Sequence, residues 1–312
     1  MMRKTRPGSA TTERRNPRSR DIDQKSARGI LRVINREDAQ VARTVGREVP
    51  KIARAVDQIA SRMRKGGRLF YIGAGTSGRL GVLDASECPP TFGVPRTMVQ
   101  GIIAGGKRAL TESVEGAEDH EELGAHDLRA RGLTAGDAVV GLAASGSTPY
   151  VLGALKYARN VGAYTIGVTM NRNSAISRIA HVTIAPETGP EVIAGSTRMK
   201  AGTAQKMVLN MLSTTVMVRL GHVYENWMIN VAKTNQKLRE RALRNLTEAT
   251  GTQVLTARHA LRQAGDNLPV ALIMLKAGLN ARQARLRLAA THGNLRKAVA
   301  SASKSVRGNK RK

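Results

Sequence analysis

Five short apolar segments recur between residues 68 and 184, and the stretches between them are long enough to form helices. The segments cover residues 68–72, 97–103, 138–143, 164–169 and 181–184. Strands that alternate with helices pair in parallel, because each connection must return across the sheet before the next strand begins. The pattern predicts an α/β fold with a five-stranded, parallel, doubly wound sheet flanked by helices. In such a fold we expect a ligand at the carboxyl ends of the strands.

The rest of the chain is predicted to divide into parts around this sheet. Residues 1–20, with seven Lys/Arg and one acid, are predicted to form a basic disordered arm. Residues 21–245 are predicted to form the sheet domain, with helices over residues 21–66 at its start. Residues 246–300 are rich in Ala, Leu and Arg and predict a small helical subdomain, followed by a basic tail over residues 301–312.

Composition excludes several classes of protein. The net charge of +28 suggests nucleic acid as a partner, but the two ends of the chain carry much of it, and two Phe, five Tyr and one Trp provide few stacking surfaces. We therefore expect no specific nucleic-acid partner. A single cysteine, Cys88, cannot form an intramolecular disulfide, and no apolar run of about 18 residues predicts a membrane span. With no apolar stretch after the basic N-terminal residues to indicate a secretory signal, we expect a cytoplasmic protein. The six histidines show no metal-ligand spacing, so we expect no metal site.

Two of the predicted strands run into loops of glycine and hydroxyl residues. Residues 73–78 (GAGTSG) fit the G-x-G-x-x-G pattern, but the next strand ends without the acidic residue that a dinucleotide site needs. Residues 145–149 (SGSTP) follow the third strand. Backbone N–H groups at a helix start, with nearby hydroxyls, can hold a phosphate without a lysine. The sequence predicts a phosphate site formed by Thr76, Ser77, Ser145, Ser147 and Thr148.

These two loops resemble those of the sugar-isomerase (SIS) superfamily of phosphosugar-binding domains. Three longer runs, residues 71–93, 114–119 and 189–206, are similar to the N-acetylmuramic acid 6-phosphate etherase family, and the third run also resembles glucokinase regulatory proteins. The resemblance covers about residues 11–300. It implies a SIS-type sheet and a homodimeric lyase of peptidoglycan recycling, which cleaves the D-lactyl ether of N-acetylmuramic acid 6-phosphate. It implies no metal and no organic cofactor.

The resemblance also implies roles for individual residues. Glu87 and Glu118 match the family's two functional glutamates. By analogy Glu118 is the base at C2, and Glu87 protonates the departing lactate and then activates water, although the two roles can be exchanged. Pro89 and Pro90 are expected to end the helix before them. Ala143 stands where the wider superfamily has a serine, which leaves the exact set of phosphate contacts open.

The run over residues 189–206 supplies further candidates. Glu191 and Ser196 are candidates for sugar contacts, and Lys200 or Arg198 for a contact with the lactyl carboxylate. The alternative is that these residues only cap and orient a long apolar helix that begins near Thr197.

Three other functions stay open beside the lyase. A non-catalytic sugar-phosphate regulator is the first, because regulators share the run over residues 189–206. The retention of both glutamates and the presence of one SIS domain rather than two favour catalysis. An aldose–ketose isomerase and a basic nucleic-acid-associated protein are the others.

Overall fold

The computed structural model describes residues 11–230 and 236–300. The chain divides into two compact units. The first comprises the residues up to Ser86 together with Arg96–Thr215, and the second comprises Glu87–Pro95 together with the residues from Val216 onwards. The predicted tail over residues 301–312 and the first ten residues of the predicted arm lie outside the described residues.

The first unit is built on a five-stranded parallel sheet, as predicted. The structure adds the strand order, which is β2-β1-β3-β4-β5. All residues of β1, β3 and β4 are buried, which explains their continuous apolar sequences. The order reverses between β1 and β3, and this is the place where ligands bind in doubly wound sheets. The strands are β1 (Leu69–Gly73), β2 (Val99–Ile103), β3 (Ala138–Leu142), β4 (Tyr164–Val168) and β5 (Val182–Ile184).

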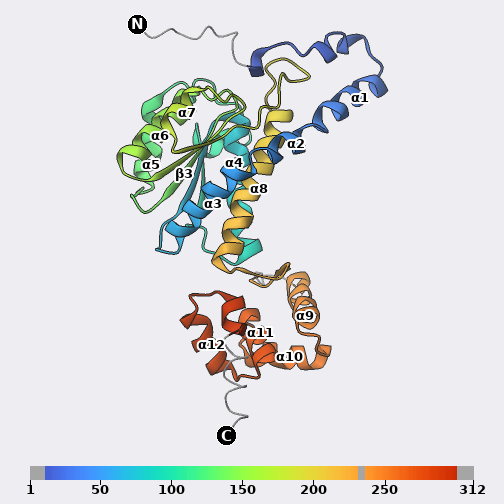
Figure 1. The fold of residues 1–312 in the computed structure, drawn as a ribbon, viewed down its shortest axis with the longest axis vertical. Coiled ribbons are helices and arrows are strands. Elements are labelled where there is room, and N and C mark those ends of the chain that lie inside the picture. Colours follow the sequence, from blue (N-terminus) through green and yellow to red (C-terminus); the bar gives the residue numbers. More distant parts are fainter. Residues whose placement is uncertain (1–10, 231–235, 301–312) are drawn as a thin grey trace. The chain divides into compact units, whose positions relative to one another are not determined.

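Helices cover both faces of this sheet (Figure 1). On one face Phe70 and Ile72 of β1 pack in a core with residues of α5, α6 and α7. On the other face Tyr71 contacts α4 at Gly81. The bounds are α1 (Ala27–Asp38), α2 (Val41–Gly46), α3 (Val49–Met63), α4 (Gly75–Phe92), η5 (Gly106–Leu110), α5 (Glu121–Ala130), α6 (Pro149–Asn160), α7 (Ala175–Ile179) and α8 (Lys200–Leu220).

The prediction of a disordered arm is wrong for residues 11–20. They contain the short 3₁₀ helices η2 (Thr11–Glu13) and η3 (Pro17–Ser19), and a further turn, η4 (Ile22–Gln24), follows them. Asn16 and Ser19 are buried. The side chain of Asn16 donates to Glu37 at 2.7 Å, and the hydroxyl of Ser19 donates to the carbonyl of Val192 at 2.7 Å. These long-range partners order a segment whose composition alone resembles a solvated tail.

The prediction that Pro89 and Pro90 end a helix is also wrong. Helix α4 includes both prolines and continues to Phe92. Proline removes a backbone donor, but its fixed φ of about −65° is compatible with a helix. The helix ends at Gly93, which has a φ of +65° and donates its N–H to the carbonyl of Pro89.

The second unit has a helical core of its own, formed by α9 (Gln236–Thr250), α10 (Val254–Gln263), α11 (Leu268–Ala277) and α12 (Ala281–Ala290). Ala242, Leu246 and Ala249 place α9 in that core. The division therefore falls near residue 215, about 30 residues before the predicted position, and a two-stranded hairpin of β6 (Val223–Tyr224) and β7 (Trp227–Met228) comes before α9. Within the described parts of the chain, no helix has the length and apolar character needed to cross a bilayer.

Candidate active site

The two glycine and hydroxyl loops leave the sheet side by side. Strands β1 and β3 are parallel neighbours, with Gly73 opposite Leu142 at their carboxyl ends. The first loop runs from Gly73 into α4, and the second runs from Ala143 to Thr148 and into α6. Both loops therefore lie at the point where the strand order reverses. The sequence predicted that each loop follows the carboxyl end of a strand in one sheet, and the structure shows that these two strands are neighbours.

The first loop makes a turn that only glycine permits. A Cβ atom on Gly78 would lie 2.7 Å from the carbonyl oxygen of Gly73, and a Cβ on Gly73 would lie 2.9 Å from the backbone nitrogen of Gly78. Carbon atoms do not approach these groups so closely, so a side chain at either position would push the start of α4 away from β1. The glycines of the motif thus serve close packing between the helix and the strand.

The side chain of Ser77 has a partner that the sequence did not indicate. Ser77 is buried, and its hydroxyl donates to the Oε1 atom of Gln205 on α8 at 2.9 Å. A phosphate dianion only accepts hydrogen bonds, so the hydroxyl of Ser77 must leave Gln205 before it can donate to a phosphate. Gln205 lies in the run over residues 189–206 and is itself 1% exposed. Its position in that run was the only signal that could have found it.

The hydroxyl-bearing residues of the second loop are exposed or half-buried. Ser145 is half-buried and accepts hydrogen bonds from the backbone N–H of Ser147 at 3.2 Å and from its hydroxyl at 3.1 Å. Asn171, just after β4, donates to the carbonyl of Ser145 at 2.9 Å and ties the loop to the sheet. Thr148 precedes α6, and its side chain makes no capping hydrogen bond. The loop therefore presents hydroxyl groups at the start of a helix, an arrangement suited to an anion.

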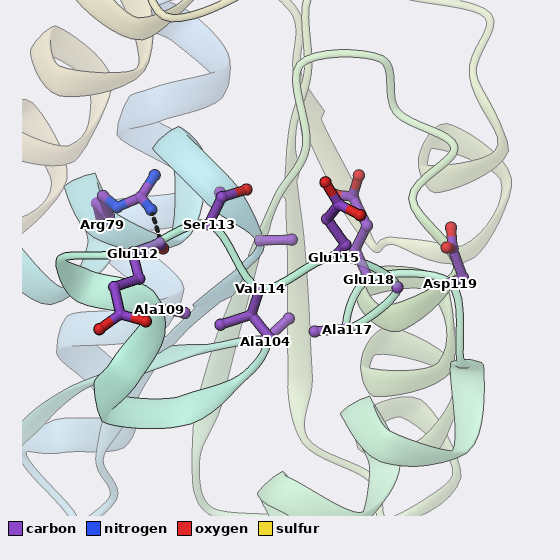
Figure 2. A pocket seen from close by; sticks show the side chains of 13 residues that line it. Arg79, Ala104, Ala109, Glu112, Ser113, Val114, Glu115, Ala117, Glu118 and Asp119 are labelled. Carbon is purple, nitrogen blue, oxygen red and sulfur yellow. Dashed lines mark hydrogen bonds between the residues drawn. The ribbon is translucent and has the colours of Figure 1, made fainter.

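Glu118 shares a pocket with the first loop. The pocket has a volume of about 280 Å³, and the residues that line it include Ala74 and Gly75 of the first loop as well as Glu118. Figure 2 shows the carboxylates of Glu115 and Glu118 directed the same way from the loop that bears them. This loop, residues 111–120, is irregular, so Glu118 is not on a helix. Its backbone carbonyl accepts from the N–H of Tyr150 at 3.0 Å, which fixes Glu118 beside the start of α6.

Glu87 does not line this pocket. It is exposed on α4, ten residues and almost three helical turns after Ser77, and it belongs to the second compact unit. The structure thus brings Glu118 together with the first loop, whereas the part of Glu87 in the site rests on the resemblance alone.

The candidates in the run over residues 189–206 lie mostly in the interior. Glu191 is fully buried, and its carboxylate accepts from the backbone N–H groups of Lys200 and Ala201 at 3.1 and 2.9 Å. Burial raises the pKa of Glu191, although these two N–H groups oppose the rise. The carboxylate caps the start of α8, which is the alternative that the sequence left open. Ser196 is half-buried and precedes that helix.

Lys200 is 3% exposed and is not available to a substrate. Its ammonium group lies 2.6 Å from the carboxylate of Glu37 on α1, which is equally buried. Burial alone would raise the pKa of Glu37, but hydrogen bonds from Lys200, Arg18 and Asn16 outweigh it and lower this pKa to about 2. The predicted contact between Lys200 and a lactyl carboxylate is therefore wrong, because a buried partner on a distant helix already holds the charge.

Comparison with known proteins places this chain in a family. Residues 51–159 match the model of the glucokinase regulatory protein N-terminal SIS domain, and residues 116–215 match the SIS domain. The chain is 52% identical to an N-acetylmuramic acid 6-phosphate etherase of Clostridium beijerinckii, over 93% of this chain and 95% of that protein. It is 54% identical to an N-acetylmuramic acid 6-phosphate etherase of Yersinia pestis, over 94% of this chain and 99% of that protein. The chain belongs to the N-acetylmuramic acid 6-phosphate etherase family.

Membership of the etherase family confirms the predicted SIS-type α/β fold and identifies the chain as an enzyme rather than a regulator. Among solved structures, a phosphoheptose isomerase from Francisella tularensis is similar over 60% of this chain and 98% of that chain, with 18% identity and a TM-score of 0.47. The etherase relatives match nearly the whole chain, so both compact units belong to the family's common architecture.

Proposed function

We propose that this enzyme is a carbon–oxygen lyase that converts N-acetylmuramic acid 6-phosphate and water into N-acetylglucosamine 6-phosphate and D-lactate. The observation that carries the proposal is the position of Glu118, which shares a pocket with one glycine loop and is fixed by its backbone to the helix that follows the other. More than 90% of the chain matches relatives named for this reaction. We place the reaction in cytoplasmic recycling of peptidoglycan sugars.

The proposed chemistry needs a base and an acid but no displacement at the ether carbon. In the open-chain aldehyde the C2 hydrogen is acidic, and Glu118 removes it as a proton. The C2 electron pair forms a C2–C3 double bond, and the C3–O bond breaks. Lactate leaves with a proton from Glu87. In the second step Glu87 takes a proton from a water molecule, the oxygen of that water adds to C3, and C2 regains a proton. General acid–base steps of this kind contribute about 10²- to 10⁴-fold each.

Ser145 is the hydroxyl that we expect to hold the phosphate most directly. Its oxygen receives two hydrogen bonds from Ser147, so its own hydrogen is left to donate. Replacing Ser145 by alanine should raise KM for the muramic substrate about tenfold and change kcat little, because the lost bond holds the ground state and the transition state alike. Steady-state kinetics measure both constants.

The matched control is Ser177→Ala. The hydroxyl of Ser177 donates to the carbonyl of Ser174 at the start of α7, outside both loops, and its removal should leave KM unchanged. An unaltered KM in the Ser145 variant would remove this residue from the phosphate site.

Detection of D-lactate tests the reaction itself. The purified protein is incubated with N-acetylmuramic acid 6-phosphate in heavy water, and the products are analysed by mass spectrometry. We expect D-lactate and one deuterium at C2 of the N-acetylglucosamine 6-phosphate. Binding of the sugar phosphate without lactate would instead support a regulator, and release of lactate without label at C2 would exclude the elimination route.

We further propose that the enzyme is a homodimer. Leu31 on α1, Val49 on α3 and Leu83 on α4 are large apolar side chains with 65%, 48% and 47% of their surface exposed. A second subunit covers such side chains where they form one apolar patch on the surface. Sedimentation equilibrium at micromolar concentration should give twice the chain mass of 33.5 kDa, and a monomer at that concentration would contradict the proposal.

A further inference from the structure

The pocket that contains Glu118 has an unbalanced charge. Four of the residues that line it are acids, namely Glu112, Glu115, Glu118 and Asp119. Among the described residues that line the pocket, Arg79 is the one with a basic side chain. The proposed substrate brings a carboxylate on its lactyl group in addition to its phosphate. Such a carboxylate can enter an acidic pocket only where a cation offsets the repulsion.

Arg79 is held in place by one edge of its guanidinium group. Its Nε–H donates to the carbonyl of Leu110 at 3.1 Å, and its Nη2 donates to the carbonyl of Glu112 at 2.8 Å. Both acceptors belong to the segment that leads from η5 into the loop of Glu118. Figure 2 shows the guanidinium extending from α4 toward this loop, with the bond to Glu112 drawn.

The other edge of the same group is unused. Guanidinium has five N–H donors, and the two bonds to carbonyls occupy Nε and one hydrogen of Nη2. Both hydrogens of Nη1 and the second hydrogen of Nη2 have no acceptor within the described residues. The Nη1 and Nη2 atoms form a planar fork that matches the two oxygens of a carboxylate. Because the carbonyls already fix the side chain, little conformational entropy is lost when this fork is filled.

We propose that the Nη1–Nη2 edge of Arg79 binds the lactyl carboxylate of the substrate and selects sugars that carry this acid. The inference rests on the proposed function, since it names a contact within the same site. The other two cations considered from the sequence do not fit. Lys200 is committed to Glu37 in the interior, and Arg198 is exposed but does not line the pocket.

The test compares two ligands that differ by the lactyl group. For wild type, Arg79→Gln and Arg79→Lys, kinetics give KM for N-acetylmuramic acid 6-phosphate and the inhibition constant for N-acetylglucosamine 6-phosphate, which lacks the acid. We expect Arg79→Gln to raise KM about ten- to hundredfold and leave the inhibition constant within about twofold of wild type. Arg79→Lys should recover only part of the loss, because ammonium cannot form the fork.

Arg131→Gln is the matched control. Arg131 is exposed, donates to the side chain of Gln100 at 3.1 Å and lies outside the pocket, so its replacement should affect neither ligand. Equal weakening of both ligands in Arg79→Gln would show that Arg79 only tethers the loop, and unchanged constants would show that it touches no carboxylate. Either result overturns the inference.

Failure of the proposed function appears separately, as absence of lactate release by wild type. Direct titration of the two sugars then decides the inference, since a binding ratio unaltered by Arg79→Gln overturns it.

Discussion

Replacing Glu118 by glutamine should slow lactate release about 10²- to 10⁴-fold, the usual contribution of a general base. The amide keeps the size of the side chain but cannot accept a proton. Glu118 is exposed, so its replacement leaves no buried group without a partner and should not alter the fold. The loss should therefore appear in kcat, with binding of the sugar phosphate nearly intact. Single-turnover kinetics measure the rate of the chemical step, and a binding titration measures the affinity for the sugar phosphate.

Glu122→Gln is the control for this substitution. Glu122 comes four residues after Glu118 and is exposed in the first turn of α5, but it lies outside the pocket. It should keep normal turnover. Glu87→Gln is expected to reduce turnover to a similar degree, because the resemblance assigns Glu87 as the acid that protonates the departing lactate. Turnover close to wild type in the Glu118 variant would exclude this residue as the base at C2.

The second large effect is on stability. Replacing Lys200 by methionine should lower the free energy of unfolding by about 3–5 kcal/mol, the range found when one partner of a buried ion pair is removed. The carboxylate of Glu37 would remain in the interior with only Arg18 and Asn16 as partners. Chemical denaturation of the wild type and of Lys200→Met, monitored by circular dichroism, gives the difference in their free energies of unfolding.

Lys156→Met is a closely matched control. Lys156 lies 2.6 Å from Glu121, the same distance as the buried pair, but the two side chains are 51% and 43% exposed. Its loss should cost less than about 1 kcal/mol. The double variant Lys200→Met with Glu37→Leu should recover much of the lost stability, because it removes the isolated charge. If Lys200→Met and Lys156→Met lowered the free energy of unfolding equally, the buried pair of Lys200 and Glu37 would not have the special importance for stability that we assign to it.

The same pair contributes to the acid sensitivity of the wild type. The pKa of Glu37 lies at about 2 in the folded protein, below its ordinary value of 4.5. A lowered pKa means that the carboxylate stabilises the fold fully above about pH 4.5, and that this contribution is lost as the pH falls toward 2. The Lys200 variant should show less of this loss.

Most of the architecture followed from local patterns in the sequence. The five apolar segments became five parallel strands within about two residues of their predicted bounds, since a strand buried on both faces must be apolar throughout. Parallel pairing then placed the two glycine loops at one edge of the sheet without any knowledge of side-chain contacts. The boundary near residue 215 was not predictable in this way, because α9 resembles any amphipathic helix and only its partners assign it to the second unit.

The sequence by itself thus determined the sheet and the position of the two loops, and the resemblance adds the prediction that Glu87 and Glu118 are catalytic. Only the tertiary structure decided which charged residues of the conspicuous motifs are buried and which line the pocket. Asn16, Glu37 and Lys200 join across as many as 184 positions of the chain to form one buried network, and Glu191 caps α8 beside them. Arg79 reaches the pocket instead. Burial and partner choice depend on residues far apart in the chain, and no local pattern of residue types records them.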